Sequence, residues 1–125
     1  MDISVPFNFN ENLRNFLQRC GYAAFLDPNT QQQSFTRRLG GGFYPRFHIY
    51  INEKDSLNFL SLHLDQKKPS YAGAHAHSGE YNGPLVDQEA SRIRGLIKNQ
   101  LDNQNQKPTP VPQPNKNGFF SRLFK

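Results

Sequence analysis

The 125-residue chain contains no tryptophan and only one cysteine, Cys20. A single cysteine excludes an internal disulfide, and no apolar run reaches the roughly 20 residues that a membrane-spanning helix needs. Residues 1–13 also lack the basic start and the apolar run of a secretory signal. These absences favour a cytoplasmic protein that has no transmembrane segment.

The formal charge of +5 is divided unevenly along the chain. Residues 1–101 hold eleven basic and nine acidic side chains, whereas residues 102–125 hold four and one. A nucleic-acid-binding domain usually carries its basic residues on one face. The candidates for such a face, which lie in or near the central strands, are Arg37, Arg38, Arg46, Tyr50 and Phe59.

Apolar residues recur at helical spacing in two segments. The first helix is expected within residues 10–22, capped by Asn10 and stopped by Gly21. The second is expected to begin at Pro84 and to run to Leu101, with Asp87 near its positive end. Between them, four strand-like runs occupy residues 22–26, 33–39, 46–52 and 57–65.

The last two of these runs alternate between apolar and polar side chains. A four-residue loop at 53–56 would place Ile49 opposite Leu60 and His48 opposite Ser61. Both apolar sets then lie on one face, and His48 and His63 lie diagonally close on the other. This second face is a candidate surface for binding or catalysis.

The fold class that these elements predict is α+β. We expect a small single domain with one helix, a four-stranded largely antiparallel sheet and a second helix, with both helices on the apolar face of the sheet. The compact domain covers residues 1–101. Residues 102–117 are rich in Pro, Asn and Gln and predict a disordered linker, followed by a short amphipathic peptide at 118–125.

Two groups of histidines could carry chemistry. His75 and His77 form a His-x-His pair that predicts a metal site if Glu80, His48 or His63 completes the ligand set. A solvated polar loop explains the same pair without a metal. His48 and His63 are candidates for general acid–base catalysis, although histidines on an open sheet face also serve to cover a core. The glycine run 40–42 is interpreted as a flexible joint rather than an anion site.

The order of elements resembles that of small double-stranded-RNA-binding-like domains, a group that includes toxin nucleases of toxin–antitoxin pairs. The resemblance covers residues 10–97: a helix that ends in Cys-Gly-Tyr, then antiparallel strands with a histidine in the third, then a helix. It implies an RNA-cleaving histidine, and His48 is the position that matches.

The C-terminal peptide becomes amphipathic if it is helical. It is similar to the short basic-aromatic segments of bacterial membrane-targeted GTPases and division ATPases. The burial of four large apolar side chains, after the cost of ordering them, leaves a few kcal/mol, so one copy would bind a membrane only marginally. The predicted docking residues are Phe119, Phe120, Arg122, Leu123 and Phe124.

These observations lead to one functional hypothesis and two alternatives. We expect a non-enzymatic adaptor domain whose C-terminal peptide docks to a protein partner or to an anionic membrane surface, at the inner face of the membrane. The first alternative is an RNA-binding or RNA-cleaving domain. The second is a metal-dependent hydrolase that uses the His-rich loop, with a divalent metal as cofactor.

Overall fold

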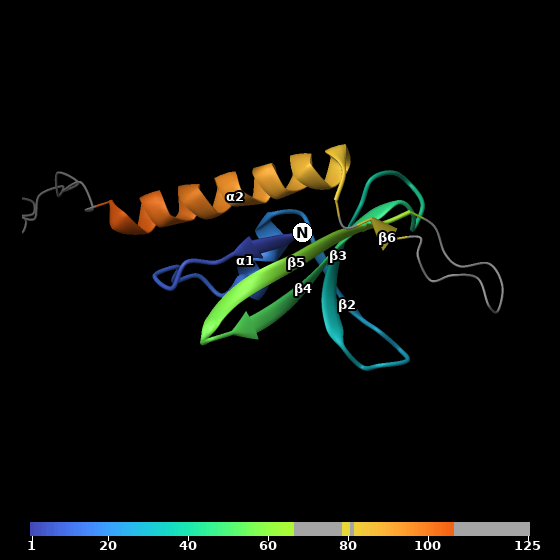
Figure 1. Cartoon of the computed structure of the whole chain (residues 1–125), viewed down its shortest axis with the longest axis horizontal. Helices are drawn as coiled ribbons and strands as arrows, with labels where there is room; N and C mark the ends of the chain where they lie inside the picture. The colour runs from blue at the N-terminus through green and yellow to red at the C-terminus, as the bar shows by residue number, and fades with distance from the viewer. Residues whose placement is uncertain (67–78, 81, 107–125) are drawn as a thin grey trace, which may run out of the picture.

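The part of the chain that the structure describes folds into one antiparallel sheet with two helices on one of its faces (Figure 1). The computed structural model describes residues 1–66, 79–80 and 82–106. In chain order the elements are β1 (Asp2–Ser4), α1 (Leu13–Arg19), β2 (Ala23–Leu26), β3 (Gln33–Arg38), β4 (Arg46–Lys54), β5 (Leu57–Asp65), β6 (Gly79–Glu80) and α2 (Pro84–Asn105). The α+β class is therefore confirmed.

The sheet has the order β1-β5-β4-β3-β2, and β6 also pairs with β5. The four expected strands correspond to β2, β3, β4 and β5. The expectation of four strands missed β1 and β6, because they have three and two residues, too few for an alternating pattern to be recognised. Figure 1 shows β1 between α2 and β5.

The β4–β5 hairpin has a tighter turn than expected. Lys54 pairs with Leu57, so the turn contains only Asp55 and Ser56, both with positive φ (55° and 65°). Positive φ at both central residues is the geometry of a type I′ turn. The four-residue loop was therefore wrong, and the register moves by two residues. A shift of two keeps each side chain on its expected face.

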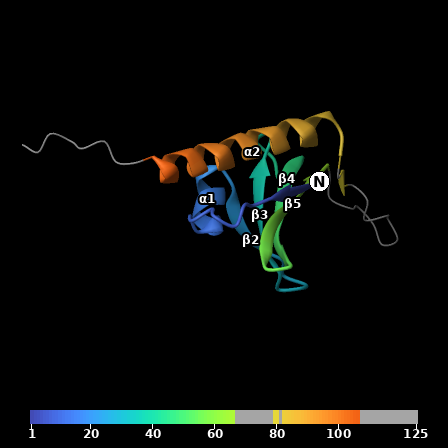
Figure 2. The same cartoon turned by 60° about the vertical axis from the view of Figure 1, so that its left-hand side comes forward.

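One face of the sheet forms the core with both helices. Strand residues such as Ile49, Leu60 and Leu62 are at most 1% exposed, and they belong to one cluster with Phe16 of α1 and Ile93 of α2. Figure 2 shows α2 running across the sheet, with α1 below its C-terminal half. The opposite face of the sheet carries the polar members of the strands.

Helix α1 is short, and its boundaries are set by specific residues. Its N-cap is Asn12 rather than the expected Asn10, since the Asn12 side chain accepts a hydrogen bond from the N–H three residues later. At the other end Gly21 has φ +99°, and the N–H groups of Gly21 and Tyr22 bond to the last helical carbonyls. This is a Schellman cap, as the glycine predicted.

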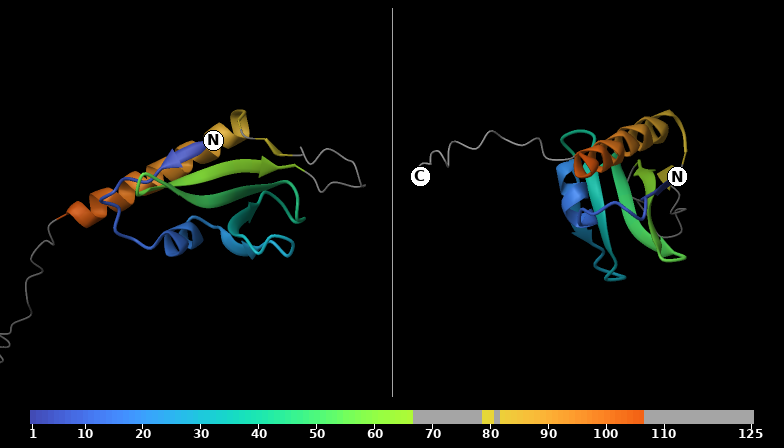
Figure 3. Two further views of the ribbon diagram at one scale, coloured as in Figure 1. Left: turned by 60° about the horizontal axis from the view of Figure 1, so that its bottom comes forward. Right: turned by 90° about the vertical axis from the view of Figure 1, so that its left-hand side faces the viewer.

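Helix α2 begins at Pro84, as expected, but continues past the predicted end at Leu101 to Asn105. The additional turn contacts the rest of the domain, since Gln104 donates a hydrogen bond to the carbonyl of Asn8. Residues 102–105 therefore belong to the helix rather than to the linker. Figure 3 shows α2 crossing the sheet, with its C-terminal end extending past the strands.

Candidate functional site

His48 and His63 are direct partners on neighbouring strands. They lie opposite each other on the polar face of β4 and β5, with ring centroids 4.9 Å apart. The expected register placed them diagonally, whereas the observed register, shifted by two residues, pairs them directly. His48 is 5% exposed and His63 9% exposed.

Asp65 joins the two histidines. Its Oδ2 lies 3.0 Å from His48 Nδ1, and its Oδ1 lies 2.9 Å from His63 Nε2. Arg46, the direct partner of Asp65 on β4, donates from Nε to Oδ2 at 3.0 Å. We call His48, His63 and Asp65 the His–Asp cluster. Every member comes from a paired strand, so the backbone ladder holds the three side chains in position.

The charge of Asp65 is stabilised by these partners. Partial burial by itself would raise the pKa of the carboxyl group, but hydrogen bonds from His48, His63 and Arg46 outweigh it. The net effect holds the pKa of Asp65 well below its usual range. The carboxylate is therefore ionised and accepts hydrogen bonds through both oxygens.

Ser34 of β3 fixes the orientation of His48. Its Oγ lies 2.7 Å from His48 Nε2, and the hydroxyl donates to the carbonyl of Phe25 at 3.3 Å. The hydrogen bond to Ser34 orients the ring, so the Nδ1 of His48 faces Asp65. An ionised carboxylate can only accept a hydrogen bond, so the Nδ1 that faces it at 3.0 Å holds a proton or, in its place, a metal ion.

Aromatic side chains cover the His–Asp cluster. The Tyr50 ring lies 4.6 Å from that of His48 and stacks on His63 at 5.9 Å, while Phe25 meets His48 edge-on at 6.1 Å. Arg46 lies over the rings of Phe25 and Tyr44. The cluster is thus largely shielded from water, and the side chain of Asp65, 17% exposed, is its most open member.

The cluster has the donor set of a metal centre. One nitrogen from each histidine and one oxygen of Asp65 all lie within 4.8 Å of one another, the one such group found among the described residues. Two imidazoles and a carboxylate are ligands for zinc or for another divalent transition metal. The same groups could also transfer protons, because an imidazole paired with a carboxylate is a general acid–base unit.

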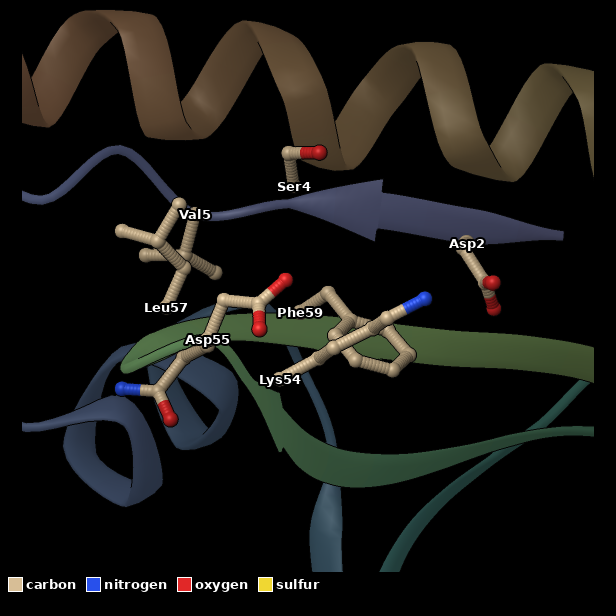
Figure 4. A pocket seen from close by; sticks show the side chains of 8 residues that line it. Asp2, Ser4, Val5, Lys54, Asp55, Leu57 and Phe59 are labelled. Carbon is tan, nitrogen blue, oxygen red and sulfur yellow. The ribbon is translucent and has the colours of Figure 1, made fainter.

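Two of the predicted nucleic-acid-binding residues lie away from this cluster. Arg37 is on the helix side of the sheet, where it forms an ion pair with Glu89 of α2. Phe59 lies four residues from His63 along β5, in a hollow of about 360 Å³ between β1 and the β4–β5 turn. Figure 4 shows Phe59 there with Lys54 and Asp55. Phe59 is on the face of the cluster but at the far end of β5, whereas Arg46 and Tyr50 contact the cluster and Arg38 pairs with Arg46.

Several predicted site residues lie outside the described residues. These are His75 and His77 of the His-rich loop and the docking residues Phe119, Phe120, Arg122, Leu123 and Phe124. For Glu80 the structure describes the backbone, which pairs with Leu64 beside Asp65. Gly79, the next described residue after the segment that contains His75 and His77, is the direct partner of Asp65.

Sequence reasoning missed Asp65 and Ser34 as site residues. A signal was present for Asp65, because it follows His63 by two positions in one strand and so shares its face. The expected register obscured it, since it placed Asp65 opposite Tyr44 rather than Arg46. Ser34 gave no comparable signal: only the pairing of β3 with β4 brings it to His48.

The fold and the cluster together define a small α+β domain with a largely buried His₂Asp cluster. None of the helices that the structure describes is long and apolar enough to cross a membrane. Comparison with family models, with curated proteins and with solved structures finds no match to this chain. The function must therefore be argued from the site itself.

Proposed function

We propose that this domain is a metal-dependent hydrolase that binds one divalent transition-metal ion, zinc in the first instance, through His48, His63 and Asp65. The observation that carries the proposal is the convergence of two imidazole nitrogens and a carboxylate oxygen within 4.8 Å. Three protein ligands leave one position of a tetrahedral zinc open for water, which distinguishes catalytic zinc sites from closed structural ones.

The groups around the cluster support the metal interpretation. A histidine that binds a metal through one nitrogen usually hydrogen-bonds through the other, and His48 Nε2 has this partner in the buried Ser34. A ligating carboxylate is usually hydrogen-bonded as well, and Arg46 supplies that bond to Asp65. A metal ion at His48 Nδ1 would also replace the proton that otherwise separates this nitrogen from the carboxylate.

The proposed chemistry follows from the open position. A zinc ion held by His48, His63 and Asp65 would supply a Lewis acid that activates water for the hydrolysis of an ester or an amide. The guanidinium of Arg46 lies next to the cluster, where positive charge would stabilise negative charge that develops in the transition state. Tyr50 and Phe25 limit the access of bulk water, which strengthens these interactions.

The test begins with metal content. Protein purified without a histidine tag, stripped with EDTA and dialysed against Zn²⁺, should retain one ion per chain, and it should hydrolyse bis(p-nitrophenyl) phosphate only when loaded. His63→Ala should lose both properties. His75→Ala combined with His77→Ala is the matched control, since it also removes imidazoles, and it should retain the metal. Loss of the metal in the control alone would move the site to the loop and overturn this proposal.

The adaptor function expected from the C-terminal peptide concerns residues outside the described ones and stays a prediction. It does not compete with the site for residues, because all members of the His–Asp cluster lie in the sheet. A hydrolase with a docking peptide would satisfy both hypotheses.

A further inference from the structure

A second feature lies on the same face of the sheet, next to the His–Asp cluster. A hollow of about 430 Å³ opens where β2, β3 and the start of β4 meet, lined in part by Phe25, Thr36, Arg38, Phe43 and Arg46. Its volume falls in the range of small-molecule sites, about 300–1,000 Å³. Thr36 is the direct partner of His48, so the hollow and the cluster adjoin.

Two positive charges face each other at this hollow. Arg38 of β3 and Arg46 of β4 are direct cross-strand partners, and like charges in such positions repel. Asp65 neutralises Arg46. Among the described residues Arg38 has no acidic partner, and its guanidinium lies 4.1 Å above the ring of Phe43. The hollow therefore has one positive charge that an anion would balance.

The aromatic residues at the hollow present flat apolar surfaces. Phe43 is 63% exposed although it is a large apolar side chain. Phe25 connects the two regions, because its ring lies 5.0 Å below the Arg46 guanidinium and also contacts His48. Arginines that bind phosphate oxygens beside exposed aromatic rings form the usual surface for nucleotides, whose bases stack while their phosphates pair with the charge.

We infer that this hollow binds a nucleotide phosphate, with Arg38 on the phosphate and Phe43 against the base, so that the substrate of the hydrolase is a nucleotide or a single-stranded nucleic acid. The inference names the substrate class of the site and in that sense rests on the proposed function. The binding itself requires no metal, because Arg38, Phe43 and Arg46 are not members of the His–Asp cluster.

The test uses fluorescence anisotropy with the full chain and a labelled eight-nucleotide adenylate RNA at low ionic strength. EDTA is present throughout, so that the result is independent of the metal site. Arg38→Gln should weaken binding about tenfold, the effect of losing one charged hydrogen bond. It should also reduce the slope of log K against log salt by about 0.7, the value for one phosphate contact on a single strand.

Arg14→Gln is the matched control, since it removes the same charge from an exposed position in α1, and its affinity should stay within about twofold of the parent chain. Phe43→Ala should weaken binding without a change in the salt slope, because it removes stacking and not charge.

Adenosine 5′-monophosphate should compete with the RNA, whereas adenosine should not. Competition by the mononucleotide as strong as that of the unlabelled octamer would identify a free nucleotide as the ligand, and weaker competition would identify a strand.

If Arg38→Gln and Arg14→Gln lost the same affinity for the RNA, the inference would be overturned, because binding would then depend on net charge alone. Failure of the RNA to bind at low ionic strength would overturn it as well. A chain that binds the RNA through Arg38 but takes up no metal would contradict the hydrolase and leave the nucleotide site standing.

Discussion

Asp65 and Glu89 are two carboxylates held in similar ways on opposite faces of the same sheet. Glu89 of α2 is 3% exposed and accepts hydrogen bonds from Tyr22, Arg37 and Arg92, at 2.6 Å from the tyrosine and 2.8–3.2 Å from the arginines. Its burial favours a raised pKa, but these bonds lower the pKa to about 2. In each case three donors hold an ionised carboxylate.

The difference between the two sites lies in the chemistry of the donors. Guanidinium groups stay protonated at any pH that a folded protein experiences, and a phenol close to a carboxylate does not ionise, so the partners of Glu89 can only donate. The imidazoles at Asp65 can exchange a proton for a metal ion. The helix side of the sheet therefore carries an ion-pair network that can only donate to its carboxylate, whereas the other side carries a cluster whose groups could hold a metal ion.

The network at Glu89 connects several elements of the fold. Arg92 also donates to the carbonyl of Cys20 at the end of α1, and Arg37 extends the network to β3. Burial among these groups raises the pKa of the Cys20 thiol to about 11, so this cysteine is a neutral member of the core at physiological pH. The Glu89 network therefore joins α1, β3 and α2 and stabilises the packing of the helices on the sheet.

The largest expected effect comes from Glu89→Gln. It leaves two arginines without their carboxylate, and breaking a buried pair costs about 3–5 kcal/mol. Because Arg37 and Arg92 remain about a third exposed, we expect a loss of about 2–3 kcal/mol in the free energy of unfolding. This corresponds to a melting temperature lower by roughly 10–20 °C for a domain of this size.

Glu53→Gln provides the matched control for this measurement, because Glu53 is exposed at the end of β4. Its loss should change stability by less than about 0.5 kcal/mol. Similar melting temperatures for the two variants, measured by circular dichroism, would show that the Glu89 network does not stabilise the fold.

The second prediction concerns acid. The pKa of Glu89 falls from its ordinary value of 4.5 to about 2 in the folded state, so its ionised form stabilises the fold. That contribution, about 2–3 kcal/mol, is fully present above pH 4.5 and is lost as the pH falls from 4.5 towards 2. The free energies of unfolding of the parent chain and of Glu89→Gln, measured with urea, should approach each other as the pH falls through this range. If the difference between these two free energies stayed constant down to pH 2, ionised Glu89 would not be the group that stabilises the fold.

The third prediction concerns Gly21, which lies beside Arg37. An alanine there would have φ +99°, and its Cβ would lie 3.1 Å from the Arg37 Cδ. We expect Gly21→Ala to cost about 1–2 kcal/mol through backbone strain and displacement of Arg37. Gly95→Ala is the control, since Gly95 lies in α2 with nothing within 4 Å of an added Cβ, and it should be neutral or stabilising. Equal effects would indicate that the Schellman cap contributes little.

The smallest expected effect on the fold comes from the tail. Deletion of residues 107–125 should change the melting temperature by less than about 2 °C, because the contacts of Gln104 belong to α2 and are retained.

Phe120→Ser combined with Phe124→Ser should abolish recruitment to anionic vesicles and leave both carboxylate networks intact. Vesicle binding that persists in this variant would contradict the docking function of the peptide.

The sequence predicted the faces of the sheet better than its register. Face assignment depends only on whether a shift is odd or even, so the two-residue error at the β4–β5 turn left His48 and His63 on the correct side. Asp55-Ser56 is not one of the Asn-Gly or Asp-Gly pairs that mark a type I′ turn, and the register could not be read from it. The partnership with Asp65 was therefore missed.

The Glu89 network was equally hidden. Glu89 lies two residues after Asp87 near the positive end of α2, where an acidic side chain is favourable without being buried. Its burial against Arg37 depends on how the helix packs on β3, which no local pattern specifies. Arg37 was accordingly predicted as a nucleic-acid contact, whereas the structure places it in an ion pair inside the domain.

The most direct test of the central claim is isothermal titration calorimetry of Zn²⁺ into tag-free, EDTA-treated full-length protein. We expect one site per chain in the parent and in Glu89→Gln, measured well below its melting temperature. Asp65→Asn should weaken binding by more than the roughly 10- to 100-fold that loss of an outer-shell partner costs. The absence of a stoichiometric site in the parent chain, or equal affinities for the parent and Asp65→Asn, would show that the two carboxylates are alike and that the His–Asp cluster is structural.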